Sequence, residues 1–288
     1  MPLGLSTLTL PAPLINEAVK NALLEDLGRA GDITTLATIP EEARAEAVIR
    51  ARHQGVVAGM EFVRSSFSQT GPGVTIDFKM NDGAVIQPND IFAVIRGPAQ
   101  IILSAERVAL NYLGHLSGIA TTTAKFVDRI KGTHARITCT RKTTPGLRAF
   151  EKYAVRAGGG SNHRFGLDDA ILIKDNHIAV VGSVSGAIKS ARQYAGHLIK
   201  VEVEVDSLEQ LVEALSENPD VVLLDNMDTS VLAEAVKIID GSVIAEASGG
   251  ITLDTVQDVA RTGVDYISTG WITHSSPVFD FGLDIDIQ

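Results

Sequence analysis

The chain has 288 residues, of which 45% are hydrophobic and 21% charged, and its formal net charge is −10. This composition is typical of a globular protein, and the length suits two unequal domains. The acidic balance argues against a nucleic-acid partner or an anionic-membrane surface. The single cysteine, Cys139, excludes an intrachain disulfide and a cysteine metal cluster. We interpret Cys139 as a small buried strand residue rather than a nucleophile.

The N-terminal segment lacks the basic and continuously apolar regions of a signal peptide. No apolar run approaches the ~20 residues of a membrane span. We therefore expect a cytoplasmic protein without a membrane association.

The first third of the chain predicts mixed α and β structure. Residues 14–28 carry apolar side chains at helical spacing and close on Gly28. Four segments bounded by glycine, proline or Asn-Asp predict strands, namely residues 45–60, 74–80, 90–97 and 99–104. A long helix is predicted over residues 105–131. We place the domain boundary at its start, giving an N-terminal domain of residues 1–104, onto which the C-terminal tail can pack back, and a second domain of residues 105–288.

The second domain alternates short strand-like runs with helical patterns. The runs are residues 136–140, 170–174, 200–205, 220–225, 243–248 and 266–270, and the last four begin 20 to 23 residues apart. Repeated strand–helix units predict a parallel sheet. Six units at this spacing favour an incomplete (β/α) barrel over a doubly wound sheet. No Gly-rich nucleotide-binding loop opens a helix, which weakens the nucleotide-fold alternative.

The predicted strands end in charged groups or Gly-rich turns. In α/β barrels the chemistry gathers at these carboxyl ends. The residues at the ends are Arg141, Lys142, Lys174, Glu204, Asp225, Ser248, Gly249, Gly250 and Gly270. Such a concerted set predicts a functional site there, although a single polar strand end means little.

The strand at residues 200–205 turns its two acids to one face. Its valines share the opposite face and suit packing against outer helices, so Glu202 and Glu204 point into the barrel. Buried acids need partners. We interpret Glu202 as half of a structural ion pair with a lysine, and Glu204, nearer the mouth, as a functional candidate.

The last two strands predict a phosphate pocket. Glycines after them let backbone N–H groups approach a phosphate, helped by the positive end of the following helix. Simple turn geometry is the alternative interpretation of these glycines. Glu204 and Asp225 beside a phosphate-bearing substrate would suit Mg²⁺.

Cations gather between Arg141 and His177, where seven Lys or Arg face four Asp or Glu. Five groups near the predicted mouth can grip a small anion, and they are Arg141, Lys142, His163, Arg164 and Lys174. Arg148, Lys152 and Arg156 are spaced four apart on a predicted helix, and we expect them to form a solvated face. The remaining histidines show no paired ligand spacing, so a transition-metal site is not expected.

Long motifs of the chain resemble the quinolinate phosphoribosyltransferase family. They are TRKTTPGLR, GGGSNHRFGLDDAILIKDNHI, VEVEV, VLLDNM, ASGGIT and TGVDYISTGWITHS, with LLEDLGRAGDITT and ERVALNYLGHLSGIAT upstream. The resemblance implies an N-terminal α/β sandwich domain and an incomplete α/β barrel. It further implies a pentosyltransferase of NAD biosynthesis that uses Mg²⁺. Such an enzyme converts quinolinate and phosphoribosyl pyrophosphate into nicotinate mononucleotide, pyrophosphate and CO₂. Members are similar in forming homodimers in which an arginine, here Arg107, completes the neighbouring site.

The resemblance also implies roles for individual residues. It assigns the binding of the dicarboxylate to Arg107, Arg141, His163, Arg164 and Lys174. Lys142 matches a lysine near the pyrophosphate, and Glu204 and Asp225 match acids that hold the ribose hydroxyls and the metal. The 5′-phosphate cradle matches Ser248, Gly249, Gly250, Gly270 and His274. The resemblance leaves open whether Lys142 or Lys174 assists decarboxylation.

Cys139 departs from the family pattern, in which many members have Asp or Gly before the Thr-Arg-Lys motif. The departure bears on the hydrogen bonding that aims Arg141. Two alternatives stay open: the related molybdenum-utilisation homologue, and a non-catalytic protein that binds a phosphate ligand on a barrel scaffold.

Overall fold

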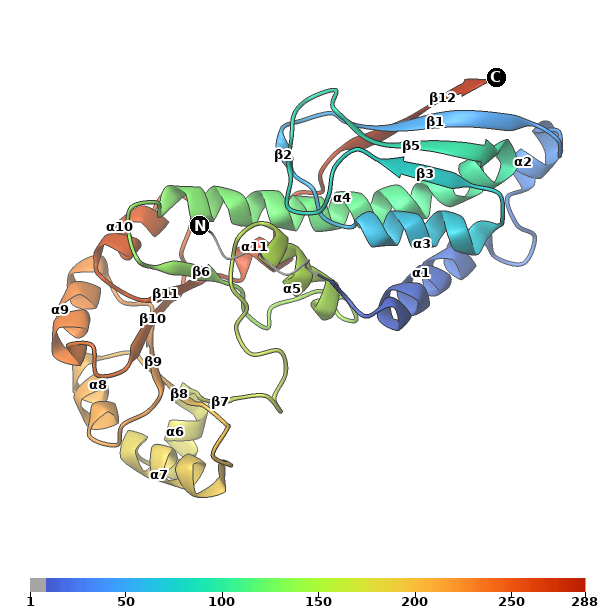
Figure 1. Cartoon of the computed structure of the whole chain (residues 1–288). Coiled ribbons are helices and arrows are strands. Elements are labelled where there is room, and N and C mark those ends of the chain that lie inside the picture. The colour runs from blue at the N-terminus through green and yellow to red at the C-terminus, as the bar shows by residue number, and fades with distance from the viewer. Residues whose placement is uncertain (1–8, 288) are drawn as a thin grey trace. The chain divides into compact units, whose positions relative to one another are not determined.

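The structure is a computed structural model that describes residues 9–287 (Figure 1). The chain forms two compact units, and each is described by itself. The first runs up to Thr122 and includes Arg156–Gly159 and the segment from Ser276 onward. The second comprises Thr123–Val155 and Gly160–Ser275. None of the described helices is long and apolar enough to cross a membrane.

The first unit combines helices with a four-stranded antiparallel sheet. The helices are α1 (Ala12–Leu27), α2 (Ile33–Thr38), α3 (Met60–Thr70) and α4 (Ala99–Arg129), the last continuing into the second unit. The strands are β1 (Arg44–Ala51), β3 (Thr75–Phe78), β5 (Ile91–Pro98) and β12 (Phe281–Ile287), in the order β12-β1-β5-β3. The short strands β2 (Gly55–Val56) and β4 (Val85–Ile86) form a separate pair.

One face of this sheet packs on α3 and α4. Strand β1 alternates strictly, with Ala45, Ala47, Ile49 and Ala51 buried. Small alanines on the strand let the helices approach closely, and Phe67 of α3 fills the space between them. The C-terminal strand β12 pairs antiparallel with β1 along seven residues, so both ends of the chain contribute to this core.

The strand predicted at residues 99–104 is wrong, because those residues form the first turns of α4. Ala99, Ile102 and Ala105 are all buried, which is the spacing of a helical face rather than of a strand. Pro98 ends β5 and suits the entry to a helix, since its fixed φ and missing N–H cost little there.

The second unit contains six parallel strands, close to the predicted ones. They are β6 (Arg136–Thr138), β7 (Ile171–Ile173), β8 (Val201–Val205), β9 (Val221–Asp225), β10 (Ile244–Ser248) and β11 (Tyr266–Ser268). The helices are α5 (Arg148–Ala157), α6 (Asp175–Val181), α7 (Val184–Tyr194), α8 (Leu208–Leu215), α9 (Thr229–Ile239), α10 (Val256–Arg261) and α11 (Trp271–His274).

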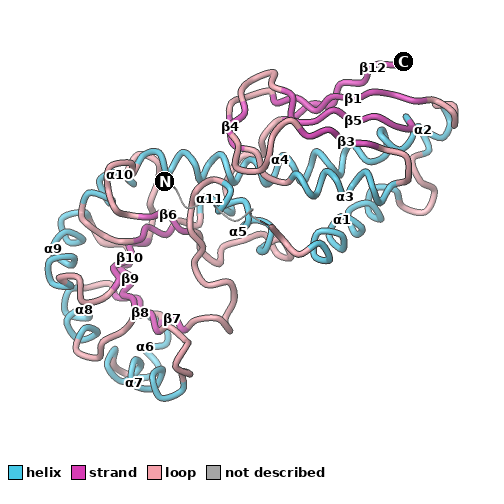
Figure 2. Tube along the Cα trace, in the orientation of Figure 1, coloured by secondary structure: helices cyan, strands magenta, loops and turns pink. Residues whose placement is uncertain are grey.

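These strands form an open arc in the order β6-β11-β10-β9-β8-β7, with helices α7 to α10 on its outer side (Figure 1). Among the described residues, the edge strands β6 and β7 do not pair with each other. The predicted incomplete α/β barrel is therefore confirmed. Figure 2 shows that the chain between α5 and β7 is almost entirely loop, and this loop carries His163 and Arg164.

Candidate active site

A cavity of about 690 Å³ opens at the carboxyl ends of the parallel strands, within the size range of small-molecule sites. Nearly all residues singled out from the sequence line it. They are Arg141, Lys142, His163, Arg164, Lys174, Glu204, Asp225, Ser248, Gly249, Gly250, Gly270 and His274. Arg107 is the exception: it is exposed on α4 in the first unit and does not line this cavity.

Two guanidinium groups form the cationic part of the wall. Arg164 donates from Nη1 to the carbonyl oxygen of Ala170 at 3.0 Å. The buried Nε atoms of Arg141 and Arg164 have no hydrogen-bond partner among residues 9–287. Burial, together with the charge of Arg141, lowers the pKa of Arg164. Two buried donors beside one cavity favour an anionic ligand, because unsatisfied buried donors are costly.

The loop that carries Arg164 is held by its own side chains. The carboxylate of Asp169 accepts hydrogen bonds from the backbone N–H groups of Phe165 and Gly166, at 2.6 and 2.9 Å. Burial opposes the charge of Asp169, but these N–H groups lower its pKa overall. The loop therefore has a fixed shape although it lacks regular secondary structure.

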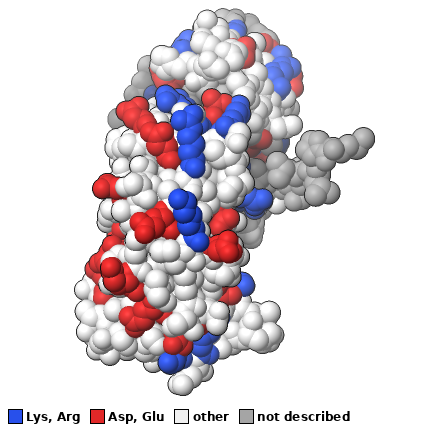
Figure 3. All heavy atoms as spheres, turned by 90° about the vertical axis from the view of Figure 1, so that its left-hand side faces the viewer, with Lys and Arg blue, Asp and Glu red and all other residues white. Residues whose placement is uncertain are grey.

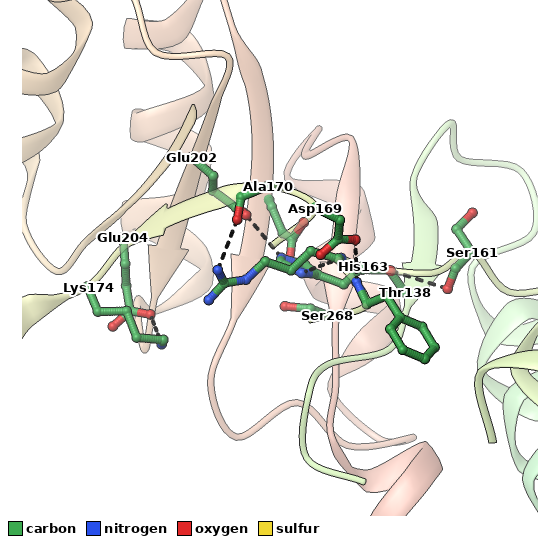
Figure 4. Close-up of polar contacts among 12 residues, drawn as sticks. Thr138, Ser161, His163, Asp169, Ala170, Lys174, Glu202, Glu204 and Ser268 are labelled. Atoms are coloured by element: carbon green, nitrogen blue, oxygen red, sulfur yellow. Dashed lines mark hydrogen bonds and ion pairs between the residues drawn. The ribbon is translucent and has the colours of Figure 1, made fainter. Parts of the chain in front are cut away.

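His163 uses both ring nitrogens within the protein. Its Nδ1 accepts a hydrogen bond from the backbone N–H of Arg164 at 2.8 Å. Its Nε2 lies 3.0 Å from Glu202 (Figure 4) and 3.6 Å from Glu246. Burial opposes the charge of the ring, yet the two acids raise the pKa of His163 overall.

Glu202 has a histidine partner, so the predicted ion pair with a lysine is wrong. The side chain points inward as expected, and Val201, Val203 and Val205 are buried on the other face. The histidine comes from the loop after α5, and the sequence gives no periodic signal for that long-range pairing. The second acid beside His163 is Glu246. Burial and the nearby charge of Glu202 raise the pKa of Glu246 to about 7.

The second acidic residue of β8 lies nearer the mouth. Glu204 Oε2 accepts a hydrogen bond from Lys174 Nζ at 2.5 Å, and the lysine side chain is 46% exposed (Figure 4). On the next strand, Asp225 Oδ2 accepts a hydrogen bond from Asn226 Nδ2 at 2.7 Å. Asn226 has a left-handed backbone, with φ of 54°, and it also lines the cavity. Asn226 is not among the site residues predicted from the sequence, although it directly follows a strand-end acid.

Helix α5 is not the solvated face that its charge spacing predicts. Lys152 is only 2% exposed and donates to the carbonyl oxygen of His163 at 2.9 Å and to Cys139 Sγ at 3.1 Å. Arg148 is half-buried and donates to Thr143 Oγ1 and to the carbonyl oxygen of Phe165. Arg156 is exposed, as expected.

The neighbouring Glu151 is fully buried and accepts a hydrogen bond from the backbone N–H of Thr144 at 3.1 Å. One helix thereby joins the loop of Arg141 to the loop of His163. The loops lie over the charged side chains, and this cover cannot be inferred from helical spacing alone.

Cys139 is buried, as predicted, directly after β6. Its thiol donates to Asn162 Oδ1 at 3.4 Å, and its backbone N–H donates to the carbonyl oxygen of Ser161 at 3.4 Å. With the ammonium of Lys152 on the same sulfur, Cys139 links the Thr-Arg-Lys segment to the loop that precedes His163. The thiol and the backbone N–H of Cys139 therefore both have hydrogen-bond partners, although the Nε of the nearby Arg141 has none among residues 9–287.

Two glycines shape the opposite wall of the cavity. Gly249 has φ of 95°, and an added Cβ would lie 2.2 Å from Asn226 Oδ1, so a side chain there would be both strained and obstructed. A Cβ on Gly270 would lie 2.9 Å from Lys142 Cδ. The following helices α10 and α11 have only six and four residues, so long helix dipoles do not characterise this wall.

The carboxylates of Glu204 and Asp225 suit a hard divalent cation. They end adjacent strands, line one cavity, and each has one oxygen in a side-chain hydrogen bond. Mg²⁺ is commonly held by one or two carboxylates together with substrate phosphate oxygens. The donor set therefore fits Mg²⁺.

The outer surface shown in Figure 3 has a different character from the cavity. Basic and acidic side chains are interspersed over it. At the cavity, by contrast, Arg141, Lys142 and Arg164 all line one wall.

Comparison with known proteins gives consistent matches. Residues 32–117 match the N-terminal domain model of quinolinate phosphoribosyl transferase, and residues 119–284 match its C-terminal domain model. The chain is 43% identical to a probable nicotinate-nucleotide pyrophosphorylase (carboxylating) of Bacillus subtilis, over 95% of this chain and 94% of the relative. It is 44% identical to the corresponding Mycobacterium leprae protein, over 93% and 96% of the two chains.

A solved structure gives the same result. The nicotinate-nucleotide pyrophosphorylase of Francisella tularensis superposes with a TM-score of 0.93 at 35% identity, over 98% of this chain and 99% of the other.

Proposed function

The chain belongs to the quinolinate phosphoribosyl transferase family, and we infer that it transfers a phosphoribosyl group from phosphoribosyl pyrophosphate to quinolinate. The carboxylate beside the ring nitrogen leaves as CO₂, and the products are nicotinate mononucleotide and pyrophosphate. The chain is thus a decarboxylating pentosyltransferase of NAD biosynthesis.

One observation carries this function: a single cavity joins two arginines with unsatisfied buried donors to two strand-end carboxylates and a glycine turn. A pyridine dicarboxylate needs the cations, and a ribose needs carboxylates that accept from its hydroxyls. A phosphate needs backbone N–H groups at close approach. A simple binding protein for one of these ligands has no need of the other walls.

We assign the dicarboxylate to Arg141 and Arg164, whose guanidinium forks match carboxylate oxygens. Lys174 lies beside them at the mouth, where it can exchange its contact with Glu204 for a substrate oxygen. His163 supports this wall by accepting from the backbone N–H of Arg164. Together these contacts hold the ring with its nitrogen toward the sugar, which is a positioning contribution.

The acids and glycines serve the phosphoribosyl donor. Glu204 and Asp225 accept from the ribose hydroxyls and would also hold Mg²⁺. When bound, the metal supplies positive charge that stabilises the departing pyrophosphate. Lys142 lies on the same side and compensates the same charge. Ser248, Gly249, Gly250, Gly270 and His274 form the cradle for the 5′-phosphate.

The reaction then needs no protein nucleophile. The ring nitrogen attacks the ribose C1 as the bond to pyrophosphate breaks, and positive charge moves onto the ring. The positively charged ring accepts the electron pair of the adjacent carbon–carboxylate bond, so CO₂ departs. A proton finally replaces it on the ring carbon. Both Lys142 and Lys174 are candidates to assist this step.

Two further features belong to the proposal. The family resemblance suggests a homodimer in which Arg107 of one subunit completes the site of the other, and the exposure of Arg107 on α4 is compatible with that role. We also propose a cytoplasmic location, supported by the acidic composition and the single cysteine.

The test is a product assay with purified protein, quinolinate, phosphoribosyl pyrophosphate and Mg²⁺. We expect nicotinate mononucleotide with quinolinate and not with nicotinate as the acceptor, and a loss of rate when EDTA is added. A failure to form product with either acceptor would contradict the function and favour a binding protein.

A further inference from the structure

A buried acid lies beneath the cavity and has no part in the function proposed above. Glu246 is on β10 and its side chain is only 7% exposed. Three groups face it: Glu202 from β8, His163 from the loop after α5, and the Ser268 hydroxyl from β11. Among residues 9–287, one oxygen of Glu246 and one of Glu202 have no hydrogen-bond partner.

This cluster has the composition of a metal site, because ligand atoms of His163, Glu202 and Glu246 lie within 4.8 Å of one another. Its surroundings oppose a divalent cation. The charge of Arg164 acts on Glu202, and the buried ammonium of Lys152 acts on His163. A proton is a better counter-charge here, since it adds one positive charge rather than two and can be shared along hydrogen bonds.

The cluster communicates with the cavity through two residues. His163 and Ser268 both line the cavity and both contact Glu246. Glu202 also helps to balance the charge of Arg164, which together with Arg141 would engage a dicarboxylate. An anion with two negative charges at those arginines weakens that balance, because opposite charges interact strongly where water is excluded. Its arrival makes an ionised Glu246 less favourable.

We propose that binding of a dicarboxylate at Arg141 and Arg164 is coupled to uptake of a proton at Glu246, beneath the substrate. The identity of the ligand as quinolinate rests on the proposed function. Glu246 is then a positioning residue: its proton relieves repulsion between the interior acids and the ligand, and it keeps His163 in place behind the backbone of Arg164.

The titration of Glu246 suits this role. Burial and the charge of Glu202 raise its pKa to about 7, so Glu246 is partly ionised at neutral pH. Added negative charge nearby raises a carboxyl pKa further, which favours uptake rather than release. By linkage, affinity for the dicarboxylate must then fall as pH rises through and above this range.

Isothermal titration calorimetry of the full-length protein with quinolinate, in the absence of the phosphoribosyl donor, tests the coupling. At pH 7.5, the observed enthalpy is plotted against the ionisation enthalpy of three buffers, and the slope gives the protons taken up. Because Glu246 with a pKa of about 7 is already about one-quarter protonated at pH 7.5, we expect between about half and three-quarters of a proton per site. The dissociation constant should rise with pH between 7 and 9, by at most about tenfold per unit.

Two variants with the same substitution sharpen the test. Glu246→Gln keeps the shape but cannot titrate, so its slope should fall close to zero and its affinity should lose the pH dependence. Glu234→Gln, at an exposed position of α9, should match the wild type. A wild-type slope of zero, or equal slopes for Glu246→Gln and the wild type, would overturn the proposal. If Glu246→Gln does not fold, the wild-type slope and pH dependence still decide.

Two controls distinguish proton uptake at Glu246 from metal binding and from catalysis. Loss of proton uptake after treatment with EDTA would overturn the proposal, because it would assign the cluster to a metal. Proton uptake without product in the assay with phosphoribosyl pyrophosphate would uphold the coupling and contradict the proposed function. Product formation without uptake would do the reverse, and absence of any quinolinate binding heat would contradict both.

Discussion

Glu202 and Glu204 are two residues apart on the same face of β8, yet they occupy different environments. Glu202 belongs to the buried cluster with His163 and Glu246, which we call the floor of the site. It lies 3.0 Å from His163, whose side chain is only 11% exposed. Glu204 lies at the mouth, against a lysine whose side chain is 46% exposed. The floor pair is fixed by its surroundings, whereas the mouth pair can exchange partners with a ligand. One strand therefore supplies a buried acid and a cavity-lining acid at successive inward positions.

The difference follows from the burial of the partners: the two acid side chains are 9% and 13% exposed, whereas His163 is 11% and Lys174 is 46% exposed. An exposed ion pair contributes little to the free energy of folding, because water solvates both partners after separation. Removal of one partner from a buried pair leaves a polar group without compensation, which costs more. Substitutions at the mouth should chiefly affect activity, and substitutions at the floor should affect stability as well.

The largest expected effect belongs to the cationic wall. Arg164→Ala should lower kcat/KM for quinolinate by roughly 100- to 1,000-fold, because a charge-assisted contact to a desolvated carboxylate is lost. Steady-state kinetics with varied quinolinate measures the effect. Arg261→Ala, an exposed arginine of α10, is the matched control. Unchanged kinetics in Arg164→Ala would remove this residue from the site.

Lys152 tests whether the support behind the wall is structural. Lys152→Ala should lower the free energy of unfolding by about 2–4 kcal/mol, because the His163 carbonyl and Cys139 lose a buried partner. Urea denaturation measures the change. Lys189→Ala removes an exposed lysine that is paired with Glu217, and its effect should stay below about 1 kcal/mol. Equal changes in the free energy of unfolding in the two variants would show that the buried contacts of Lys152 do not stabilise the protein.

The free energy of unfolding should also depend on pH, because of Glu246 at the floor. Because the pKa of Glu246 rises from 4.5 to about 7 on folding, the folded state binds more protons than the unfolded state within that range. Its contribution to stability is present below pH 4.5 and is lost as pH rises to 7. The loss amounts to about 3 kcal/mol.

Denaturation curves of the wild type and Glu246→Gln at several pH values isolate this contribution. As pH rises from 5 to 8, the wild type should lose more free energy of unfolding than Glu246→Gln does. Parallel curves would contradict the burial of an ionisable acid at the floor.

The smallest expected effect on stability lies at the mouth. Glu204→Gln should change the free energy of unfolding by less than about 1 kcal/mol, whereas Glu202→Gln should lower it by about 1–3 kcal/mol. In activity assays Glu204→Gln should nevertheless reduce kcat. If Glu204→Gln proves as destabilising as Glu202→Gln, the contrast between floor and mouth is wrong.

Much of the barrel can be predicted from the sequence because its signals are local. The valines and acids of residues 201–205 alternate strictly, and charged residues or Gly-rich turns mark the carboxyl ends of the strands. Parallel strands bring such ends to one edge, so residues 141, 174, 204 and 225 line one cavity. The segment 99–104 is wrongly predicted as a strand because a short apolar run fits a buried strand as well as a helix face.

Long-range contacts cannot be predicted in this way. The spacing of Lys152 on its helix predicts exposure, but Cys139 and the carbonyl oxygen of His163, from two other segments of the chain, are its partners. The pairing of His163 with Glu202 and Glu246 joins a loop to two separate strands. No periodicity within one element encodes such a contact, so the floor of the site required the three-dimensional structure.

The most direct measurement uses quinolinate labelled with ¹³C in the carboxylate beside the ring nitrogen. With phosphoribosyl pyrophosphate and Mg²⁺, the protein should release labelled CO₂ and pyrophosphate in equal amounts, together with unlabelled nicotinate mononucleotide. Arg164→Ala should slow the release of both products equally. Pyrophosphate release without labelled CO₂, or retention of the label in the nucleotide, would contradict a decarboxylating phosphoribosyl transfer in this cavity.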